Sequence, residues 1–530
     1  MSNTVNLGNG KWAIKDSELL GYSLTDDAEL IALTLDVSRA SSGTRVNASG
    51  LIETVEKILS GDKVTNGDFS NGTTDWSNPS YGGNNSATIS IDNGSLKVQK
   101  DNNLDWRSAF VSQDLINYTF GKEYKVQFSL KDGNTNGGEV FVRSLFDSSN
   151  SAIVEKTLTD DWVQYTEYFT PDRGDSISFG VVEWHEAGSG QYYFIDNVSV
   201  IEVNRDNLAR IDYTDSVEGV LLTEPQSTNL NYYSEDFSQW SVENSSIVPN
   251  TTISPDGTQN ATTWNVNTTN AKIQRAIGSL TIGEEYTVSF YIKAESPMDI
   301  GIGGIVTATP TISVTTEWQR FEMTQTSSST VRYPQLKYAG DLGTLYIWGA
   351  QLEESSHATS IMPTYGEIAS RAGDVINNGG EAINFNSAEG VLFAEIAALS
   401  DDETSRSIRI SDGSSLNYVA IRFNNGGSNR IYTRVNVGSS ANYFYLDSSH
   451  NITDMNKIAI RYKDSDFATF INGVKVSSQT SGSLFPVNTL DTLSVHGSNE
   501  TSEPFYGKTK NIQVFKEALT DAQLITLTTI

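Results

Sequence analysis

The sequence predicts an all-β protein, a multidomain chain of β-sandwich modules of the jelly-roll type. Aromatic and β-branched runs of about four to eight residues alternate with turns rich in Gly, Asn, Ser and Thr, a spacing typical of sandwiches. Helical periodicity is scarce, and its best candidates are residues 27–36 and 520–527. The third observation is a repeat, because one eleven-residue stretch occurs twice in nearly the same letters.

The repeated stretch reads GKEYKVQFSLK at 121–131 and GEEYTVSFYIK at 283–293. Val126, Phe128 and Leu130 alternate with polar residues, which predicts a strand with one buried face. Three flanking pairs follow in the same order, namely 66–70 with 234–238, 160–170 with 316–326, and 192–202 with 345–354. We therefore predict a duplicated domain in which both copies share one fold.

Composition and charge exclude several classes of function. The chain has 530 residues, enough for several domains of about 100–200 residues each. Its net charge of −29 makes nucleic acid an unfavourable partner, because phosphate binding depends on Lys and Arg. The absence of cysteine excludes disulfides and thiol catalysis. The sequence has no basic and apolar signal segment at its start and no apolar run for membrane insertion, so we expect synthesis in a cytoplasm without conventional export.

Breaks in the pattern predict six segments along the chain. They are an N-terminal attachment region (1–60), a first β-sandwich (61–202), a short segment (203–229), a second β-sandwich of the same type (230–356), a linker (357–380) and a last β-sandwich (381–530). Residues 1–60 and 203–229 are expected to be the two halves of one small split domain. The first sandwich would then be an insertion, which is tolerated because the ends of a domain often lie close together.

Five stretches outside the first sandwich form an ordered set. They are SRASSGTRVNASGLIE, ARIDY, VLLTEPQSTNLNYYSEDFSQW, YIWGAQLEESSHATSIMPT and SRAGD. With them the chain resembles bacteriophage fibre or spike proteins of heads or tails, whose hallmark is matched by Leu221, Leu222, Glu224, Pro225, Gln226, Thr228 and Asn229. The resemblance implies an exposed appendage of a virion. Its implied partners are capsid or tail proteins and further copies of the chain, with a trimer favoured.

The two outer sandwiches carry further motifs. The first contains NGDFSNGTTDW (66–76), NGSLKVQ (93–99), DWVQYTEYFT (161–170) and YYFIDNVSV (192–200), and it resembles the jelly-roll carbohydrate-binding modules of xylanases and cellulases. The last contains FATFINGVKV (467–476) and YGKTKNIQVFKEALTDAQLITL (506–527), and it resembles a laminin-G or concanavalin-like sandwich. We expect a hairpin at its Asn-Gly pair and a closing helix capped near Thr520 and Asp521.

Sugar binding is expected in the first sandwich. Flat aromatic faces and a few convergent polar groups suit a sugar site. The candidates, which stand outside the obvious core alternation, are Tyr81, Trp106, Trp184, His185 and Tyr192. Residues 181–193 are the richest stretch, and we expect the site mainly around Trp184. The alternative is that these side chains cover the edge of the sandwich or pack against a neighbouring domain.

The resemblance to carbohydrate-binding modules also implies a structural calcium ion near the first and last strands. The corresponding residues are Asp68 and Asp196. The acidic residue usual just after the first Phe is replaced by Ser70. In the second copy we place Gly349 opposite Asp196, so that copy is expected to lack the ion. The alternative for Asp196 is a residue that forms a turn with Asn197.

No motif indicates catalysis, so we expect a protein that is not an enzyme. The four His residues have no spacing that suggests a metal site or a triad, and adjacent carboxylates such as Asp401 and Asp402 are common in an acidic chain. We expect a structural virion fibre or spike that adheres to host-surface or environmental glycans. The alternatives are a purely architectural fibre or decoration protein, and a secreted accessory protein of polysaccharide degradation.

Overall fold

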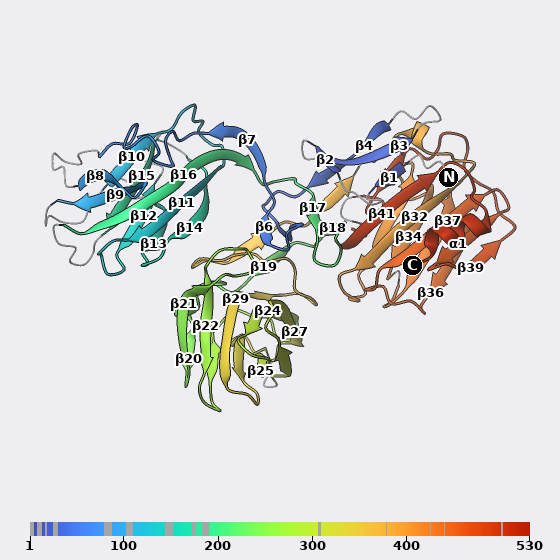
Figure 1. Cartoon of the computed structure of the whole chain (residues 1–530). Coiled ribbons are helices and arrows are strands. Elements are labelled where there is room, and N and C mark those ends of the chain that lie inside the picture. The colour runs from blue at the N-terminus through green and yellow to red at the C-terminus, as the bar shows by residue number, and fades with distance from the viewer. Residues whose placement is uncertain are drawn as a thin grey trace. The chain divides into compact units, whose positions relative to one another are not determined.

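The computed structural model describes residues 5–7, 13–15, 18–24, 30–78, 87–101, 110–143, 152–171, 176–182, 190–305, 309–377, 379–424, 426–438, 440–499 and 502–530. Its elements are almost all strands, which confirms the all-β class (Figure 1). The chain divides into two compact units, residues 56–204 and residues 1–55 with 205–530. Across the described ranges, no helix is long and apolar enough to cross a membrane.

The unit of residues 56–204 is a sandwich of two sheets. Its strands are β7 (Lys57–Asp62), β8 (Ala87–Asp92), β9 (Ser95–Lys100), β10 (Phe110–Asp114), β11 (Tyr124–Asp132), β12 (Glu139–Arg143), β13 (Ala152–Thr157), β14 (Val163–Phe169), β15 (Ser176–Val182) and β16 (Tyr192–Asn204). One sheet has the order β14-β11-β16-β9-β8, with β7 also paired to β16, and the other has the order β10-β15-β12-β13. Alternation along β11 buries Val126, Phe128 and Leu130 between the sheets.

The second sandwich, in the other unit, repeats this topology. Its elements are η1 (Phe237–Gln239), β20 (Ser241–Glu243), β21 (Ser246–Thr252), β22 (Ala261–Val266), β23 (Lys272–Gln274), β24 (Glu285–Ala294), β25 (Met298–Gly303), β26 (Thr311–Val314), β27 (Gln319–Thr326), β28 (Gln335–Tyr338) and β29 (Gly343–Glu353). Its sheets have the orders β27-β24-β29-β22-β21 and β20-β23-β28-β25-β26. The two repeated stretches, in β11 and β24, occupy the same position, second from one edge.

A shared irregularity shows how close the two folds are. The pairing of β11 with β16 shifts just after Gln127, and the pairing of β24 with β29 shifts just after Ser289, the matching residue of the repeat. Across each shift lies a residue with positive φ, Asn197 at 52° and Gly349 at 64°. Asn and Gly are the residues that adopt this backbone conformation most readily. The same bulge therefore bends the same strand in both sandwiches.

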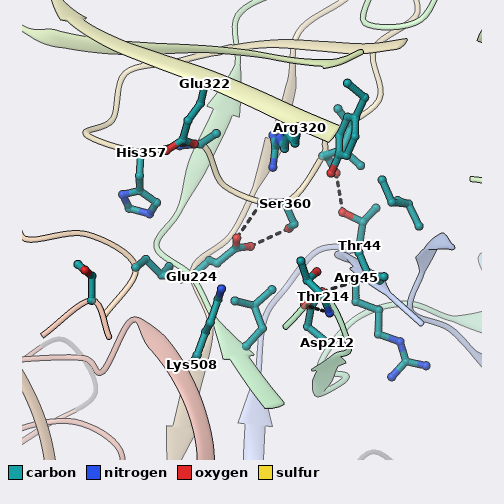
Figure 2. A pocket seen from close by; sticks show the side chains of 18 of the residues that line it. Thr44, Arg45, Asp212, Thr214, Glu224, Arg320, Glu322, His357, Ser360 and Lys508 are labelled. Atoms are coloured by element: carbon teal, nitrogen blue, oxygen red, sulfur yellow. Dashed lines mark hydrogen bonds between the residues drawn. The ribbon is translucent and has the colours of Figure 1, made fainter. Parts of the chain in front are cut away.

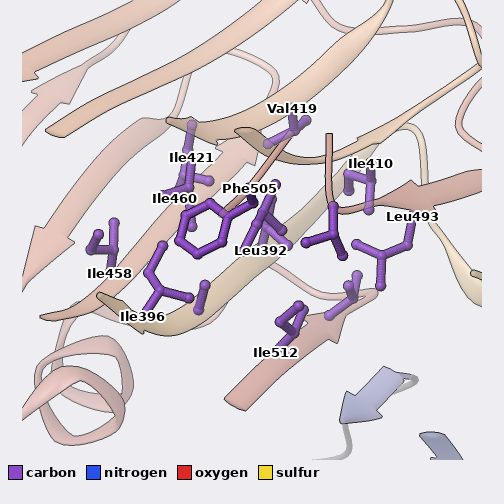
Figure 3. Packing of buried hydrophobic residues seen from close by; sticks show 14 of the residues in the cluster. Leu392, Ile396, Ile410, Val419, Ile421, Ile458, Ile460, Leu493, Phe505 and Ile512 are labelled. Atoms are coloured by element: carbon purple, nitrogen blue, oxygen red, sulfur yellow. The ribbon is translucent and has the colours of Figure 1, made fainter. Parts of the chain in front are cut away.

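The last sandwich packs a five-stranded sheet on a larger one. Its elements are η2 (Ala382–Asn384), β32 (Glu389–Ala398), β33 (Arg406–Ser411), β34 (Tyr418–Phe423), β35 (Ile431–Val437), β36 (Ser440–Asp447), β37 (Asn456–Lys463), β38 (Phe467–Ile471), β39 (Val474–Gln479), β40 (Thr492–Ser494), β41 (Gly507–Phe515) and α1 (Asp521–Thr528). The smaller sheet has the order β36-β35-β34-β33-β40, and the larger contains β41-β32-β37-β38-β39. Figure 3 shows Ile410, Val419 and Ile421 of the smaller sheet facing Leu392 and Ile460 of the larger.

Local sequence signals hold at the end of this sandwich. Asn472 and Gly473 form the expected turn between β38 and β39, with φ values of 48° and 82° that suit a type I′ hairpin. The closing helix α1 is confirmed, and Thr520 is its N-cap. The Thr520 side chain accepts from the Gln523 backbone, and the Gln523 side chain accepts in return from the Thr520 backbone.

The N-terminal segment joins the larger sheet of the last sandwich. Its strands are β1 (Val5–Leu7), β2 (Ala13–Lys15), β3 (Glu18–Leu24) and β4 (Leu30–Ser38), and the sheet continues from β41 through β1, β3 and β4 to β31 (Val375–Asn377). The prediction of a helix over residues 27–36 is wrong, because residues 30–38 form β4. This strand pairs with β3 on one side and β31 on the other. Pairing with distant segments thus overrides the local helical pattern.

A small region that we call the hub consists of residues 39–55, 205–229 and 357–377. Its strands are β5 (Thr44–Val46), β6 (Ile52–Thr54), β17 (Arg210–Asp212), β18 (Val220–Thr223), β19 (Ser227–Asn229) and β30 (Ala369–Arg371). The chain leaves the hub at Val55 and returns at Arg205. Backbone and side-chain hydrogen bonds join Arg39 to Asn207 at 2.9 Å each, so the two hub segments are tied together where the first sandwich is inserted.

The hub is built around a buried cluster of charges. Asp374 accepts hydrogen bonds from Arg39 at 2.7 Å and from Arg210, and Glu224 accepts from Arg210 and lies 3.0 Å from Arg371. All five side chains are almost completely buried. They come from four of the five stretches that carry the fibre resemblance. Arg371 and Asp374 of this cluster lie in residues 357–380, the segment predicted to be a linker.

Candidate functional site

Four of the five predicted sugar-binding residues, Tyr81, Trp106, Trp184 and His185, lie outside the described residues. The described flanks of these segments meet at one end of the first sandwich. Ala87 is paired with Lys100 across β8 and β9. Lys100 in turn exchanges backbone hydrogen bonds of 2.8 Å with Gln191 and Gly190. The fifth predicted residue, Tyr192, begins β16 at this same end.

Tyr192 belongs to an aromatic row on the outer face of the larger sheet of the first sandwich. Tyr192 and Phe194 alternate along β16 with the buried Tyr193 and Ile195. The Tyr192 and Phe194 rings meet edge to face at 5.4 Å between centroids, and Trp162 lies 6.3 Å from Phe194. Trp162 is 41% exposed, a large value for a Trp side chain. We call Trp162, Phe194, Tyr192 and Lys97 the platform.

Polar and cationic groups complete the platform. The Lys97 ammonium lies 3.7 Å from the centre of the Tyr192 ring, a cation–π contact that covers one ring face. Lys131 of β11 is paired with Phe194, which places a second Lys on the same cross-strand row. Gly133 leaves room for the Tyr192 ring, because a Cβ on Gly133 would lie only 2.2 Å from two of the ring carbons. Aromatic faces beside hydrogen-bonding groups are the combination that a sugar site requires.

The equivalent face of the second sandwich is covered in part, around Trp348. Strand register aligns Asp196 with Trp348, which corrects our sequence alignment of Asp196 with Gly349. Trp348 is 1% exposed and packs with Ile52 of β6 and with Ile361, both from the hub. The second sandwich thus uses this face to attach to the hub. The platform residues of the first sandwich are half-buried or exposed.

The predicted calcium ligands are each engaged by their own neighbours. Asp68 accepts from the backbone and hydroxyl of Ser70, and the backbone hydrogen bond in particular lowers the pKa of Asp68. Asp196 accepts from Ser95 at 3.1 Å and from the Asn197 backbone at 2.7 Å. In the part of the chain that the structure describes, no three Asp, Glu or His side chains gather as a metal site. Calcium remains a prediction.

A pocket of about 250 Å³ lies between hub and sandwich residues of the unit formed by 1–55 and 205–530 (Figure 2). Its polar side chains are largely committed to one another. Arg320 donates to the Thr359 carbonyl at 2.6 Å and to Ser289 at 3.0 Å. Ser360 donates to Glu224 at 2.7 Å, and Glu322 accepts from the Ala358 backbone at 3.0 Å. The bonds from Arg320 to Thr359 and from Ala358 to Glu322 join the second sandwich to the hub, so the polar groups of this pocket serve mainly to connect these two parts.

His357 is the exception in this pocket. It is 7% exposed, and its Nε2 has no hydrogen-bond partner among the described residues. Burial lowers the pKa of His357, so the ring is neutral at pH 7. A single neutral imidazole defines neither an acid–base pair nor a metal site.

Sequence reasoning missed three of the four platform residues. Trp162 lies in the repeated stretch 160–170, where it matches Trp318 of the stretch 316–326. It was not among the predicted sugar-binding residues. Phe194 and Lys97 fall into the ordinary alternation of β16 and β9. The alternation of residues along β16 was the sequence signal that could have identified Phe194. In β16 it places two aromatic residues, Tyr192 and Phe194, on the face opposite to the core.

The comparisons with solved structures concern carbohydrate-binding modules, singly or in tandem, and other single domains. A search of curated proteins found no match. Among solved structures, the carbohydrate-binding module CBM40 of a Ruminococcus gnavus sialidase, bound to α2,3-sialyllactose, is 14% identical over 29% of this chain and 93% of its own, with a TM-score of 0.24. Domain 4 of a GH43 arabinanase from Geobacillus stearothermophilus is 15% identical over 29% and 73%, with a TM-score of 0.24. A CBM22 tandem from Paenibacillus barcinonensis is 10% identical over 56% and 99%, with a TM-score of 0.21.

One family model matches the sequence. Residues 394–525 match the concanavalin A-like lectin/glucanases superfamily. This range runs from β32 into α1 and contains both sheets of the last sandwich. The last sandwich is therefore similar in sequence to this superfamily over most of its length.

Proposed function

We propose that the chain is a structural fibre or spike subunit of a bacteriophage particle, and that it adheres to surface glycans through its first sandwich. The observation that carries the glycan part is the platform around Trp162 and Tyr192. In the second sandwich the part of this face around Trp348 is buried against the hub, whereas in the first the matching Asp196 is not buried and aromatic rings lie beside Lys side chains. The virion part rests on the ordered stretches that meet in the hub.

Adhesion at such a platform would depend on many copies. Stacking one aromatic ring on a sugar contributes on the order of 1 kcal/mol, judged from aromatic pairs. A single site is then weak. A homo-oligomer, for which we propose a trimer, and several fibres on one particle would convert weak sites into firm attachment by avidity.

The test is a glycan array probed with the full chain. Trp162→Ala should lower binding to every glycan that the wild type retains, by about fivefold if one stacking contact is lost. Trp318→Ala is the control and should leave binding unchanged, since Trp318 stands just before β27 as Trp162 stands just before β14. Trp184→Ala tests the loop that the sequence favoured. Equal binding by the wild type, Trp162→Ala and Trp184→Ala would contradict the proposed site.

The virion part has its own experiment. A reconstruction of purified particles should contain the chain as an exposed appendage in contact with capsid or tail proteins. Native mass spectrometry of the isolated protein should give its oligomeric state, with a trimer expected. Particles without the chain, or a protein found only in the culture fluid, would favour a secreted accessory protein.

A purely architectural role is the second candidate, and one observation favours it. The buried charges of the hub and the covered face of the second sandwich describe a joint that holds modules together. An array without any retained glycan, together with the chain on the particle, would support this spacer role.

A further inference from the structure

The outer face of the smaller sheet in the last sandwich carries a group of arginines. Arg409 of β33, Arg422 of β34 and Arg434 of β35 alternate with residues that point into the core, such as Ile408 and Ile421. The chain has 36 basic residues against 65 acidic ones, so three arginines on one face are unusual for it. We call these residues and the neighbouring Tyr418 and Tyr432 the arginine face.

The arginines lie close together because of strand register. Ala420 is paired with Arg409 on one side and with Arg434 on the other, so a small side chain separates two cations on the same cross-strand row. The Tyr418 ring lies below both, at 5.6 Å from the Arg409 guanidinium and 5.9 Å from that of Arg434. Like charges on one row destabilise a sheet. The positive charges of Arg409 and Arg434 therefore repel each other, and a bound anion would reduce this repulsion.

The partners of the three arginines are unequal. Arg422 forms an ion pair with Glu503. Arg434 donates to Asn436 at 2.7 Å, a neutral partner. Arg409 is 4% exposed, and within the described ranges it has no ion pair and its Nε has no hydrogen bond. Burying an unpaired cation is costly, and such groups are normally paired.

The space beside Arg409 can take an anionic group. A pocket of about 110 Å³ there is lined by Ser407, Arg409, Ser415, Tyr418, Arg422, Ser498, Ser502 and Glu503. Burial, and to a lesser extent the neighbouring Arg422, lowers the pKa of Arg409, while Tyr418 and Asp412 partly oppose this shift. The guanidinium nonetheless stays charged near pH 7, because an Arg begins from so high a pKa. Its planar fork of N–H donors matches a carboxylate or a sulfate.

We propose that the arginine face binds an acidic glycan, with the anionic group of a sugar held at Arg409 and with Arg434, on the same cross-strand row, as the second cation. Tyr418 lies in the pocket beside the anion, and Phe444, which is 61% exposed on β36, offers a further ring to the glycan. The aromatic and hydroxyl groups favour a sugar over an acidic peptide, because a peptide carboxylate would need the charges alone. This site extends the proposed adhesion role, but it shares no residue with the platform and can stand without it.

The experiment measures binding of the full chain to immobilised polymers in about 0.15 M salt. Polygalacturonate carries carboxylates on sugar rings, dextran sulfate carries sulfates, dextran is neutral, and poly-L-glutamate carries carboxylates without sugars. We expect retention by one of the two acidic glycans and weaker or no retention by dextran and poly-L-glutamate. Arg409→Gln and Arg434→Gln should each lower that affinity about tenfold or more, as expected for a charged hydrogen bond. Arg430→Gln, with the same change of charge in a loop of this sheet, should change it by less than about twofold.

Stability provides a second readout for the same variants. Arg409→Met removes an unpaired buried cation, so it should melt at or above the wild-type temperature while it loses glycan binding. Unchanged retention of the acidic glycans by Arg409→Gln and Arg434→Gln would overturn the proposal. Retention on poly-L-glutamate equal to that on the glycans would also overturn it, since sugar would then be irrelevant. Loss of acidic-glycan binding in Trp162→Ala alone would assign that binding to the platform instead.

Discussion

Asp374 accepts a hydrogen bond from the guanidinium of Arg39 at 2.7 Å, although 335 residues separate the two in sequence. The same carboxylate also accepts from Arg210, and the cluster has almost no access to solvent. Removing one charge leaves the others buried without compensation. Asp374→Asn or Glu224→Gln should therefore lower the free energy of unfolding by about 3–5 kcal/mol. Denaturant unfolding followed by Trp fluorescence measures this change.

A matched control is the ion pair between Arg45 and Glu53, which is 2.8 Å long but much more exposed. Arg45→Gln should cost less than about 1 kcal/mol, because water screens an exposed pair. Equal losses from Asp374→Asn and Arg45→Gln would show that the buried cluster does not hold the hub together.

Acid should destabilise the unit that contains the hub. Burial raises the pKa of Glu224, but Arg210 and Arg371 outweigh it, so the pKa falls well below its ordinary 4.5. Burial lowers the pKa of His357 below its ordinary 6.5. For both groups the unfolded chain binds more protons, so stability is lost as the pH falls, from 6.5 downward for His357 and from 4.5 downward for Glu224.

Melting curves between about pH 7.5 and pH 3.5 test this acid sensitivity. In His357→Gln the melting temperature should depend less on pH near pH 6.5 and just below, and in Glu224→Gln it should depend less on pH below about 4.5. Both variants should be less stable than the wild type at pH 7.5. A wild-type melting temperature that does not change over this range would contradict the assignment.

The first sandwich should be removable. Lys57 of β7 is paired with Asn204 of β16, so the two ends of the insertion lie side by side, and Arg39 and Asn207 join the hub just outside. Replacing residues 57–204 by a short Gly-Ser link should leave the remaining chain folded, with one cooperative melting transition fewer. Residues 56–204 expressed alone should fold and reproduce the missing transition. Aggregation of both pieces would mean that they fold as one.

Calcium binding is predicted by resemblance and can be measured directly. An ion held by Asp68 and Asp196 should raise the melting temperature of the residue 56–204 transition in about 1 mM calcium, and a chelator should reverse the rise. Asp196→Asn should abolish the effect, while Asp236→Asn, the counterpart of Asp68 in the second sandwich, should not. A melting temperature that is independent of calcium would show that Asp68 and Asp196 do not hold a stabilising calcium ion.

Signals that act between near neighbours were readable from the sequence. The Asn472–Gly473 hairpin and the Thr520 cap involve residues two or three positions apart, and the alternation in β11 depends on period two alone. The strand β4 was not readable from its own helical pattern, because it forms by pairing with β3 on one side and with β31, more than 300 residues away, on the other. In the candidate site, Tyr192 was predicted because it is an aromatic residue outside the obvious core alternation. Trp162 was identified only from the structure, in which its ring lies beside that of Phe194.

The sequence by itself determined the β-sandwich modules, the duplication and the turn and cap residues, since these follow from local periodicity and backbone preference. Tertiary structure alone decided which face of the repeated fold is covered, with Trp348 buried against Ile52 while the matching Asp196 stays at the surface. It also decided which charges are paired, with Asp374 hydrogen-bonded to Arg39, whereas Arg409 forms no ion pair among the described residues. The physical reason is that burial and ion pairing depend on segments that meet only in space, and their energies are set by the loss of water around groups far apart in sequence.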